Sequence, residues 1–310
     1  MTAPIPGLSI AGRDHPALRS FSEVILLSGF SGATVALVRD RHLPFVRKTA
    51  NRADANASLR EQAVRQRLLA DTIADCAAMP EVLGEGECDG YYYFDMAFVP
   101  SRDAVNFLAH CTFDSVAEFA ERVNRLMARL AQSPAIGARP LPPRKALVVE
   151  KLDQIVQRAG DRAAAALAPL TQAVACFETL SVERETAVHG DLTFENILVD
   201  RRGDLWLIDT IASPFDHYWI DWSKLFQECE GLWHAHRGRP LARGVTWWLR
   251  QRFFETATRL DPAYPLYHYV LLGLTFARIL PYAQGEEHLA FVEKRVIECG
   301  QAALDIFRSR

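Results

Sequence analysis

A polar segment after the middle of the chain carries the residues best suited to chemistry. Asp191 follows a glycine in a turn, Asn196 precedes one short apolar run, and Asp209 ends a second. Residues 200–203, between the two runs, have the composition of a hairpin turn, and a hairpin would place Asn196 and Asp209 side by side at one end. Aspartate and asparagine are also common turn residues, so the functional interpretation depends on all three occurring in this order.

This arrangement has a definite chemical use. A carboxylate and an amide oxygen at one end of a hairpin can bind a hard divalent cation such as Mg²⁺, which keeps several of its waters and bridges substrate phosphates. Asp191 would then lie close enough to orient an attacking hydroxyl group or to accept its proton. The pattern therefore favours phosphoryl transfer, with Asp191 as the catalytic residue and with Asn196 and Asp209 as metal ligands.

The same segment resembles a known family. His189-Gly-Asp191, followed by Asn196-Ile-Leu198 and Leu207-Ile-Asp209, is similar to the catalytic segment of aminoglycoside phosphotransferases and choline kinases. These are small-molecule kinases with a protein-kinase-like fold. The resemblance implies a phosphotransferase that uses ATP (or GTP) and Mg²⁺ to phosphorylate an alcohol group.

Two more features extend the resemblance. Residues 216–225 are similar to the Asp-x-x-x-Asp-Leu-Ala pattern of the family, in which Asp221 would brace the catalytic loop by hydrogen bonds. Residues 222–225 and the expected hinge between lobes look most like phosphotransferases encoded among surface-polysaccharide genes.

The family template also implies a nucleotide site in the N-terminal part of the chain. Ser28, Gly29, Ser31 and Gly32 resemble the loop that covers the nucleotide phosphates. Glycines there would let the backbone approach closely, and the serines could donate hydrogen bonds to phosphate oxygens. Lys48, on an expected third strand, stands where the family places the lysine that binds the α- and β-phosphates.

Lys48 needs a carboxylate partner on the next helix, which the apolar spacing predicts within residues 59–78. Glu61 is the only acidic residue near the start of that helix, which favours it as the partner. Gln62 shares a helical face with Leu59, however, and could be the inward residue instead.

The expected hinge occupies residues 92–100. Met96 would stand at the back of the adenine pocket. The carbonyl group of Ala97 and the amide of Val99 would form hydrogen bonds with the adenine ring. An ordinary core strand that ends at Pro100 would be compatible with the same role.

The elements that must position these residues divide the chain in two. Strands are expected at 24–27, 34–38, 45–49, 81–83 and 91–99, with a loop at 84–90. Helices are expected at 115–131, with capping-box spacing from Ser115, and at 146–158, 162–180 and from 219 to the end. This order predicts an α+β, bilobal, protein-kinase-like fold. A small antiparallel-sheet nucleotide-binding lobe with one helix (1–98) would precede a larger, mainly helical catalytic and acceptor-binding lobe (99–310).

The helical tail is the candidate acceptor wall. Its aromatic and histidine side chains could stack on the C–H faces of a sugar, although most would also suit a core. They are Trp219, Trp222, Trp233, His234, His236, Trp247, Trp248, Tyr267 and His268. We therefore expect a sugar or sugar-like acceptor. Acidic and basic residues are roughly matched across the tail, which does not favour a polycationic aminoglycoside. An aminoglycoside kinase and a non-catalytic nucleotide-binding module remain the alternatives.

Composition sets the broad class. The chain has 310 residues, 49% of them hydrophobic and 24% charged, with a formal net charge of −3. That balance gives no global electrostatic reason to expect a nucleic-acid partner. Six scattered cysteines form no zinc or redox motif, and no stretch resembles a signal peptide or a membrane span. The sequence predicts a cytoplasmic protein whose partner is a small-molecule hydroxyl acceptor, without nucleic acid or membrane.

Overall fold

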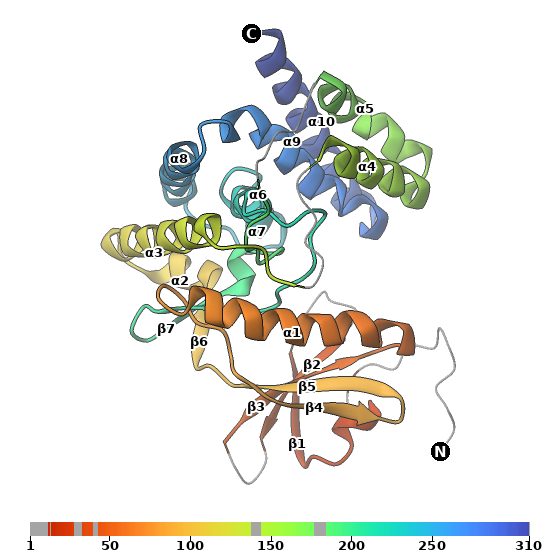
Figure 1. The fold of residues 1–310 in the computed structure, drawn as a ribbon, viewed down its shortest axis with the longest axis vertical. Coiled ribbons are helices and arrows are strands. Elements are labelled where there is room, and N and C mark those ends of the chain that lie inside the picture. The colour runs from red at the N-terminus through yellow and green to blue at the C-terminus, as the bar shows by residue number, and fades with distance from the viewer. Residues whose placement is uncertain are drawn as a thin grey trace.

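The computed structural model describes residues 12, 14–27, 33–39, 43–137, 144–176 and 184–309. It has a strand-rich lobe and a larger helical lobe (Figure 1). The expected phosphate loop, with Ser28, Gly29, Ser31 and Gly32, lies outside the described residues. Among the helices described, none combines the length and the apolar character needed to cross a bilayer.

The first lobe is an antiparallel sheet covered by a helix. Its strands lie in the order β1-β2-β3-β5-β4. They are β1 (Glu23–Leu27), β2 (Ala33–Arg39), β3 (Phe45–Ala50), β4 (Val82–Cys88) and β5 (Tyr91–Ala97). Short 3₁₀ helices at Pro16–Leu18 (η1) and Ala53–Ala55 (η2) flank the first three strands, and α1 (Asn56–Ile73) lies between the sheet and the second lobe (Figure 1). Apolar residues of α1 and β5 form the small core of this lobe.

The expected loop at 84–90 is wrong. Most of that segment belongs to β4, and the turn to β5 contains only Asp89 and Gly90, both with positive φ (51° and 81°). The alternating Gly-Glu sequence of β4 suggests a loop when read alone. Because β4 is an edge strand paired only with β5, half of its side chains face solvent, and polar or small residues are accepted there.

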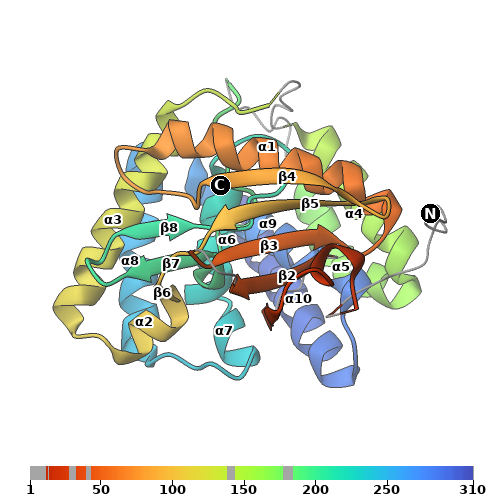
Figure 2. The ribbon, with the colours of Figure 1, turned by 90° about the horizontal axis from the view of Figure 1, so that it is seen from below.

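The second lobe combines a small sheet with helices. The sheet contains β6 (Ser101–Asp103), β7 (Ile197–Asp200) and β8 (Leu205–Leu207), and Figure 2 shows the strands of both sheets from below. The helices are α2 (Ala104–His110), α3 (Phe113–Gln132), α4 (Lys145–Ala159), α5 (Asp161–Cys176), α6 (Trp219–Cys229), α7 (Trp233–His236), α8 (Arg243–Leu260), α9 (Tyr264–Ala277) and α10 (Glu286–Arg308). The 3₁₀ helices η3 (Phe194–Asn196) and η4 (Leu280–Tyr282) complete the lobe.

One helix start differs from the expectation. α3 begins at Phe113, and its cap is Thr112, whose hydroxyl group accepts a hydrogen bond from the Ser115 amide. Threonine is also a favoured N-cap residue, and here the cap lies three residues before the predicted one.

The two lobes share a core at the end of α1. Leu69 and Ile73 are fully buried in the large apolar cluster of the second lobe. Just beyond α1, Ala78 exchanges backbone hydrogen bonds with Leu205 and Leu207 of β8, at 2.9 and 2.8 Å. The lobes are therefore tied together beside the hairpin that carries Asn196 and Asp209.

Most of the aromatic residues expected to form an acceptor wall belong to the core instead. Trp219 and Trp222 are fully buried in α6, and Tyr267 is 5% exposed. Trp247 is 62% exposed and lines neither of the cavities described below. Of that group, Trp233 lines both.

Candidate functional site

The hairpin places Asn196 and Asp209 together, as predicted. Ile197 pairs with Leu207 across β7 and β8, and the Ile208 amide donates to the Asn196 carbonyl group at 3.1 Å. At the far end the Gly203 amide donates to Asp200 O at 3.1 Å, with φ of 81° at the glycine. This turn sets the register that brings the two polar residues to the same end.

The loop before Asp191 packs tightly against the segment after Asp209. Gly190 has φ of 89°, and a Cβ atom there would lie 2.1 Å from the carbonyl oxygen of Ile211. The Ile211 amide in turn donates to the His189 carbonyl group at 3.0 Å. A glycine is required because both the backbone conformation and the lack of space exclude a side chain.

Asp221 of α6 braces this loop, as the family pattern implied. Its two carboxylate oxygens accept hydrogen bonds from the amides of His189 and Gly190, at 2.7 and 2.8 Å. Complete burial raises the pKa of Asp221 to about 7, although these two hydrogen bonds act in the opposite direction. The side chain fixes the loop and does not line either cavity.

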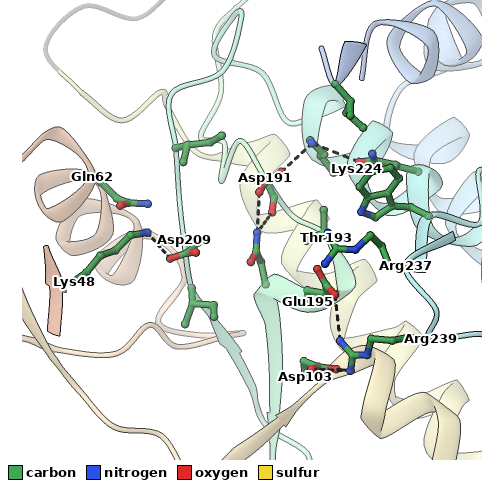
Figure 3. Close-up of a pocket in the computed structure, with 16 residues that line it drawn as sticks. Lys48, Gln62, Asp103, Asp191, Thr193, Glu195, Asp209, Lys224, Arg237 and Arg239 are labelled. Atoms are coloured by element: carbon green, nitrogen blue, oxygen red, sulfur yellow. Dashed lines mark hydrogen bonds and ion pairs between the residues drawn. The ribbon is translucent and has the colours of Figure 1, made fainter. Parts of the chain in front are cut away.

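Asp191 is held at both of its carboxylate oxygens. Asn196 Nδ2 donates to Oδ2 at 2.9 Å, and Lys224 Nζ lies 2.9 Å from Oδ1 (Figure 3). Burial alone would raise the pKa of Asp191, but the charge and hydrogen bond of Lys224 outweigh it, so the pKa lies below its ordinary value. Asp191 is therefore ionised at neutral pH.

Lys224 is a site residue that the sequence reasoning missed. It stands on α6, one turn after Asp221, and its side chain is 11% exposed. The i, i+3 spacing from Asp221 puts the two residues on neighbouring parts of one helix face. The sequence signal that could have identified Lys224 is a single lysine within a helix, α6, whose residues are all buried.

Lys48 meets Asp209 rather than Glu61. Its ammonium group lies 2.8 Å from Asp209 Oδ1, and its side chain is 1% exposed. Gln62 faces inward and donates to the Thr210 carbonyl group at 2.9 Å, whereas Glu61 is exposed. The expected Lys48–Glu61 pair is not formed in this structure, because the buried face of α1 contains Leu59 and Gln62 and leaves Glu61 exposed.

Asp209 has a strained backbone. Its φ is 61°, in the left-handed region that residues other than glycine rarely adopt. Such conformations persist where surrounding contacts impose them, and they cluster at functional sites. Two sets of contacts hold Asp209 in this conformation. Its side chain accepts a hydrogen bond from Lys48, and the backbone amides of its neighbours Ile208 and Ile211 are hydrogen-bonded.

The donor set fits a hexacoordinate oxygen-preferring cation. Because Asn196 donates through Nδ2 to Asp191, its Oδ1 is directed elsewhere and can act as a ligand, as can the carboxylate of Asp209. Within the described residues no three His, Cys, Asp or Glu side chains gather around one point. A cation held by Asn196 and Asp209 would thus complete its shell with waters and substrate phosphates, as Mg²⁺ does.

Two adjoining cavities surround these residues. The first, of about 460 Å³, is lined by Lys48, Asp191, Asn196, Asp209 and Lys224, among others (Figure 3). The second, of about 650 Å³, shares Asp191 and Lys224 with it and extends toward α4 and α10. Both volumes are of the size that binds small molecules.

The rim of the first cavity is fixed by a second cluster of charges. Arg239 donates to Asp103, the residue that caps α2, at 2.6 and 2.8 Å, and to Glu195 at 3.2 Å (Figure 3). The three groups join β6, η3 and the segment after α7, and they line the first cavity on the side away from Lys48 (Figure 3).

The expected hinge residues lie where β5 leaves the first sheet. Met96 is 5% exposed, and Ala97 and Val99 are half-buried. The Ala97 amide donates to Glu81 O at 2.9 Å, and Ser101 Oγ donates to the Val99 carbonyl group at 3.0 Å. None of Met96, Ala97 and Val99 lines the two cavities described here.

Comparison with known proteins gives a family match. A model of the phosphotransferase enzyme family matches residues 23–209, more than half of the chain. The matched range contains Lys48, Asp191, Asn196 and Asp209. A search of curated protein sequences found no significant match.

Solved structures give a consistent fold. A thermostable mutant of aminoglycoside phosphotransferase APH(4)-Ia, in complex with AMP-PNP and hygromycin B, has a TM-score of 0.63 and 16% identity over 91% of this chain and 94% of that chain. The GDP complex of aminoglycoside 2'-phosphotransferase-IIIa has a TM-score of 0.60 and 15% identity over 91% and 93%. Amicoumacin kinase, in complex with AMP-PNP and Ca²⁺, has a TM-score of 0.58 and 12% identity over 94% and 90%. These likenesses confirm the expected α+β kinase-like fold.

Proposed function

The chain belongs to the phosphotransferase enzyme family, and we propose that it uses a nucleoside triphosphate and a divalent cation to phosphorylate a hydroxyl group of a small molecule. A small-molecule kinase activity follows from membership of that family. The observation that carries the proposal for the site is that Lys48, Asp191, Asn196 and Asp209 line one cavity between the lobes. Their separate contacts fit separate tasks in phosphoryl transfer.

On this proposal, Asn196 Oδ1 and the Asp209 carboxylate hold Mg²⁺. When bound, the cation would neutralise charge on the nucleotide phosphates. Lys48, which is buried and already directed at Asp209, holds the phosphates from the side of the first lobe. Binding and orientation then supply most of the catalysis, because the transferred group passes through a loose transition state.

Asp191 acts on the acceptor. Its ionised carboxylate accepts a hydrogen bond from the acceptor hydroxyl and directs that oxygen at the γ-phosphorus. As the new P–O bond forms, the bond to the bridging oxygen breaks, the nucleoside diphosphate leaves, and the hydroxyl proton passes to Asp191. The ammonium group of Lys224 lies 2.9 Å from Asp191 Oδ1, where its charge offsets negative charge that develops on the transferred group.

We propose ATP as the donor, with GTP as the alternative. The related fold is known in complexes with AMP-PNP and with GDP, so both purines can be accommodated by this architecture. The hinge residues Met96, Ala97 and Val99 would receive the base, and Ser28, Gly29, Ser31 and Gly32 would cover the phosphates, as the family resemblance implies. The boundary between the nucleotide-binding lobe and the catalytic lobe is proposed at residues 98 and 99, where β5 has ended and β6 has not begun.

The chemical class of the acceptor has two candidates, a sugar-like molecule and an aminoglycoside. A sugar-like acceptor has support from Trp233, the single residue of the expected aromatic wall that lines both cavities. The related structures include aminoglycoside phosphotransferases, but an aminoglycoside is polycationic and would need a carboxylate-rich site. The cationic lining of the second cavity opposes an aminoglycoside acceptor.

Calorimetric titration of AMP-PNP, with and without Mg²⁺, tests the nucleotide and metal sites. Asp209→Ala should weaken Mg²⁺-dependent binding by about tenfold or more. Asp204→Ala is the matched control, because Asp204 is an exposed aspartate at the far end of the same hairpin. Equal affinities of the wild type and the Asp209 variant would overturn the metal assignment. Nucleotide binding without ATP consumption across a broad panel of hydroxyl acceptors would favour a non-catalytic module instead.

A further inference from the structure

The second cavity extends from the catalytic aspartate away from the proposed nucleotide side. Lys48, Asn196 and Asp209 line the first cavity and do not line the second. The second is walled by α4, by the segment around η4 and by the start of α10. An acceptor whose hydroxyl faces Asp191 would place the rest of its structure here.

The lining of this second cavity is cationic. Its basic side chains come from four separate parts of the chain and face a single carboxylate, that of Asp191. The basic residues are Lys151, Arg158, Lys224, Arg237 and Arg278. Such a concentration contrasts with the net charge of −3 for the whole chain.

Three of these cations have no carboxylate partner in the part of the chain that the structure describes. Lys151 Nζ donates to Gln154 Oε1 at 3.4 Å, and Arg158 Nη1 donates to Tyr282 Oη at 3.3 Å. Arg278 forms no ion pair within 4 Å among the described residues, and the carboxylate that attracts it is that of Asp191. Lys151, Arg158 and Arg278 therefore retain most of their capacity to bind an anion.

Arginines elsewhere on the molecule behave differently. Arg162, on α5, pairs with both Glu286 and Glu293, and Arg239 pairs with both Asp103 and Glu195. These two arginines are thus each paired with two carboxylates. Among the described residues, Lys151, Arg158 and Arg278 of the second cavity have no such pairs.

The cations also repel one another. Burial lowers the pKa of Lys151, and the charges of Arg278 and Arg158 lower it further. Burial likewise lowers the pKa of Arg278, against the attraction of Asp191. Holding these groups together costs stability unless a bound anion offsets the repulsion.

We propose that the second cavity binds the acceptor through an anionic group, a carboxylate or a phosphate, while a hydroxyl group of the same molecule faces Asp191. This inference rests on the proposed phosphotransferase function and names its acceptor class. Guanidinium groups bind either anion in a bidentate manner, so Arg278 and Arg158 suit both. A polycationic aminoglycoside would be repelled from the same surface.

The nucleotide triphosphate does not explain the whole cluster. Lys224 and Arg237 line both cavities and can serve the transferred phosphoryl group. Lys151, Arg158 and Arg278 line only the second cavity. The latter three are the residues assigned to the anion of the acceptor.

Binding measured with the nucleotide site filled tests the proposal. The 310-residue chain is first titrated with Mg²⁺ and AMP-PNP, and then with probes that share one ring and differ in charge: glucose, glucosamine, glucuronate and glucose 6-phosphate. Glucuronate, glucose 6-phosphate or both should bind roughly tenfold or more tightly than glucose, and glucosamine should bind most weakly. The two anionic probes distinguish a carboxylate site from a phosphate site.

Variants assign the binding to the named cations. Lys151→Gln and Arg278→Gln should each remove most of the preference for the anionic probe and leave AMP-PNP binding intact. Lys294→Gln, which removes an exposed lysine of α10, is the matched control and should keep the preference. Lys151→Gln provides the test if Arg278→Gln does not fold.

Each outcome decides between distinct conclusions. If the nucleotide binds but the anionic probes bind no more tightly than glucose, or bind the Lys151 variant equally well, the anionic-acceptor proposal is overturned and the proposed kinase function stands. If AMP-PNP does not bind at all, the proposed function fails, and the acceptor assignment fails with it.

Discussion

Lys224 on α6 forms an ion pair with Asp191, with 2.9 Å between Nζ and Oδ1. The pair joins a buried helix to the loop that carries the proposed catalytic aspartate, and both residues line both cavities. Its main electrostatic consequence is that Asp191 is ionised at neutral pH despite burial. The first two predictions separate the roles of the two residues.

Asp191→Asn should abolish most turnover while the fold survives. Asparagine is nearly isosteric and can still contact Asn196, but it loses the charge that orients the acceptor hydroxyl and accepts its proton. We expect kcat to fall by about 10²–10⁴-fold, with little change in KM for ATP, because the interaction is used mainly in the transition state. Steady-state kinetics and a melting curve measure the two effects. Turnover within about threefold of the wild type would exclude Asp191 as the catalytic residue.

Lys224→Met should lower kcat and change its pH dependence. Asp191 must be ionised to act, so activity is lost as pH falls through its pKa, which lies below the ordinary value of 3.8 in the wild type. Without Lys224, burial would raise that pKa, and the acid limb of the kcat profile should move to higher pH. We also expect kcat to fall by about 10²-fold. Lys294→Met is the control, and a profile identical to that of the wild type would show that Lys224 does not set the ionisation of Asp191.

Gly190→Ala should disrupt the site where Gly203→Ala does not. Both glycines have a left-handed φ, of 89° and 81°. The loss of stability from placing an alanine in that backbone conformation is therefore similar in the two variants. A Cβ atom at Gly190 would lie 2.1 Å from Ile211 O, whereas at Gly203 the nearest atom is 3.8 Å away, at the end of the Arg122 side chain. Gly203→Ala should cost about 1 kcal/mol, and Gly190→Ala should cost clearly more. Urea denaturation of both variants measures the difference, and equal losses would contradict the packing described.

Glu228→Gln should flatten the pH dependence of stability. Glu228 is fully buried, its Oε2 accepts a hydrogen bond from the His234 amide at 3.0 Å, and Oε1 has no partner among the described groups. Burial, followed by repulsion from Glu195, raises its pKa from 4.5 to about 8. Since the folded pKa is the higher one, the neutral side chain contributes stability that is complete below pH 4.5 and is lost as pH rises through about 8.

Glutamine keeps the acceptor for His234 and cannot ionise. The free energy of unfolding of the wild type should therefore fall more steeply than that of Glu228→Gln between about pH 5 and pH 9, by at most ~1.4 kcal/mol per pH unit. Chemical denaturation at several pH values measures both slopes. Parallel profiles would show that Glu228 is ionised in the folded protein throughout this range.

Local features of the sequence determined the hairpin and the elements around it. Residues 200–203 form a turn, and a turn fixes the register of the strands beside it. The position of Asn196 next to Asp209 followed from that register alone. The helices that end the chain and the first three strands could also be predicted from the sequence, because each depends on apolar spacing within a few residues.

Where local reasoning failed, a neighbour in space decided the outcome. Residues 84–88 read as a loop, yet they pair with β5 and form an edge strand. Ser115 has the spacing of a helix cap, yet α3 begins at Phe113 and its N-cap is Thr112. Strand pairing decided the first case, and in the second a capping residue three positions earlier begins the helix.

The partners within the site were decided only by the tertiary structure. Lys48 and Asp209 are 161 positions apart, and the rotation of α1 that turns Gln62 inward and Glu61 outward depends on its packing against the second lobe. Lys224 and the cations of the second cavity come from α4, α6, the segment after α7 and the end of α9. The tail looks electrically balanced when its charges are summed along the chain. Folding separates those charges in space, because carboxylates pair with arginines on the surface while the cations near Asp191 converge on one cavity.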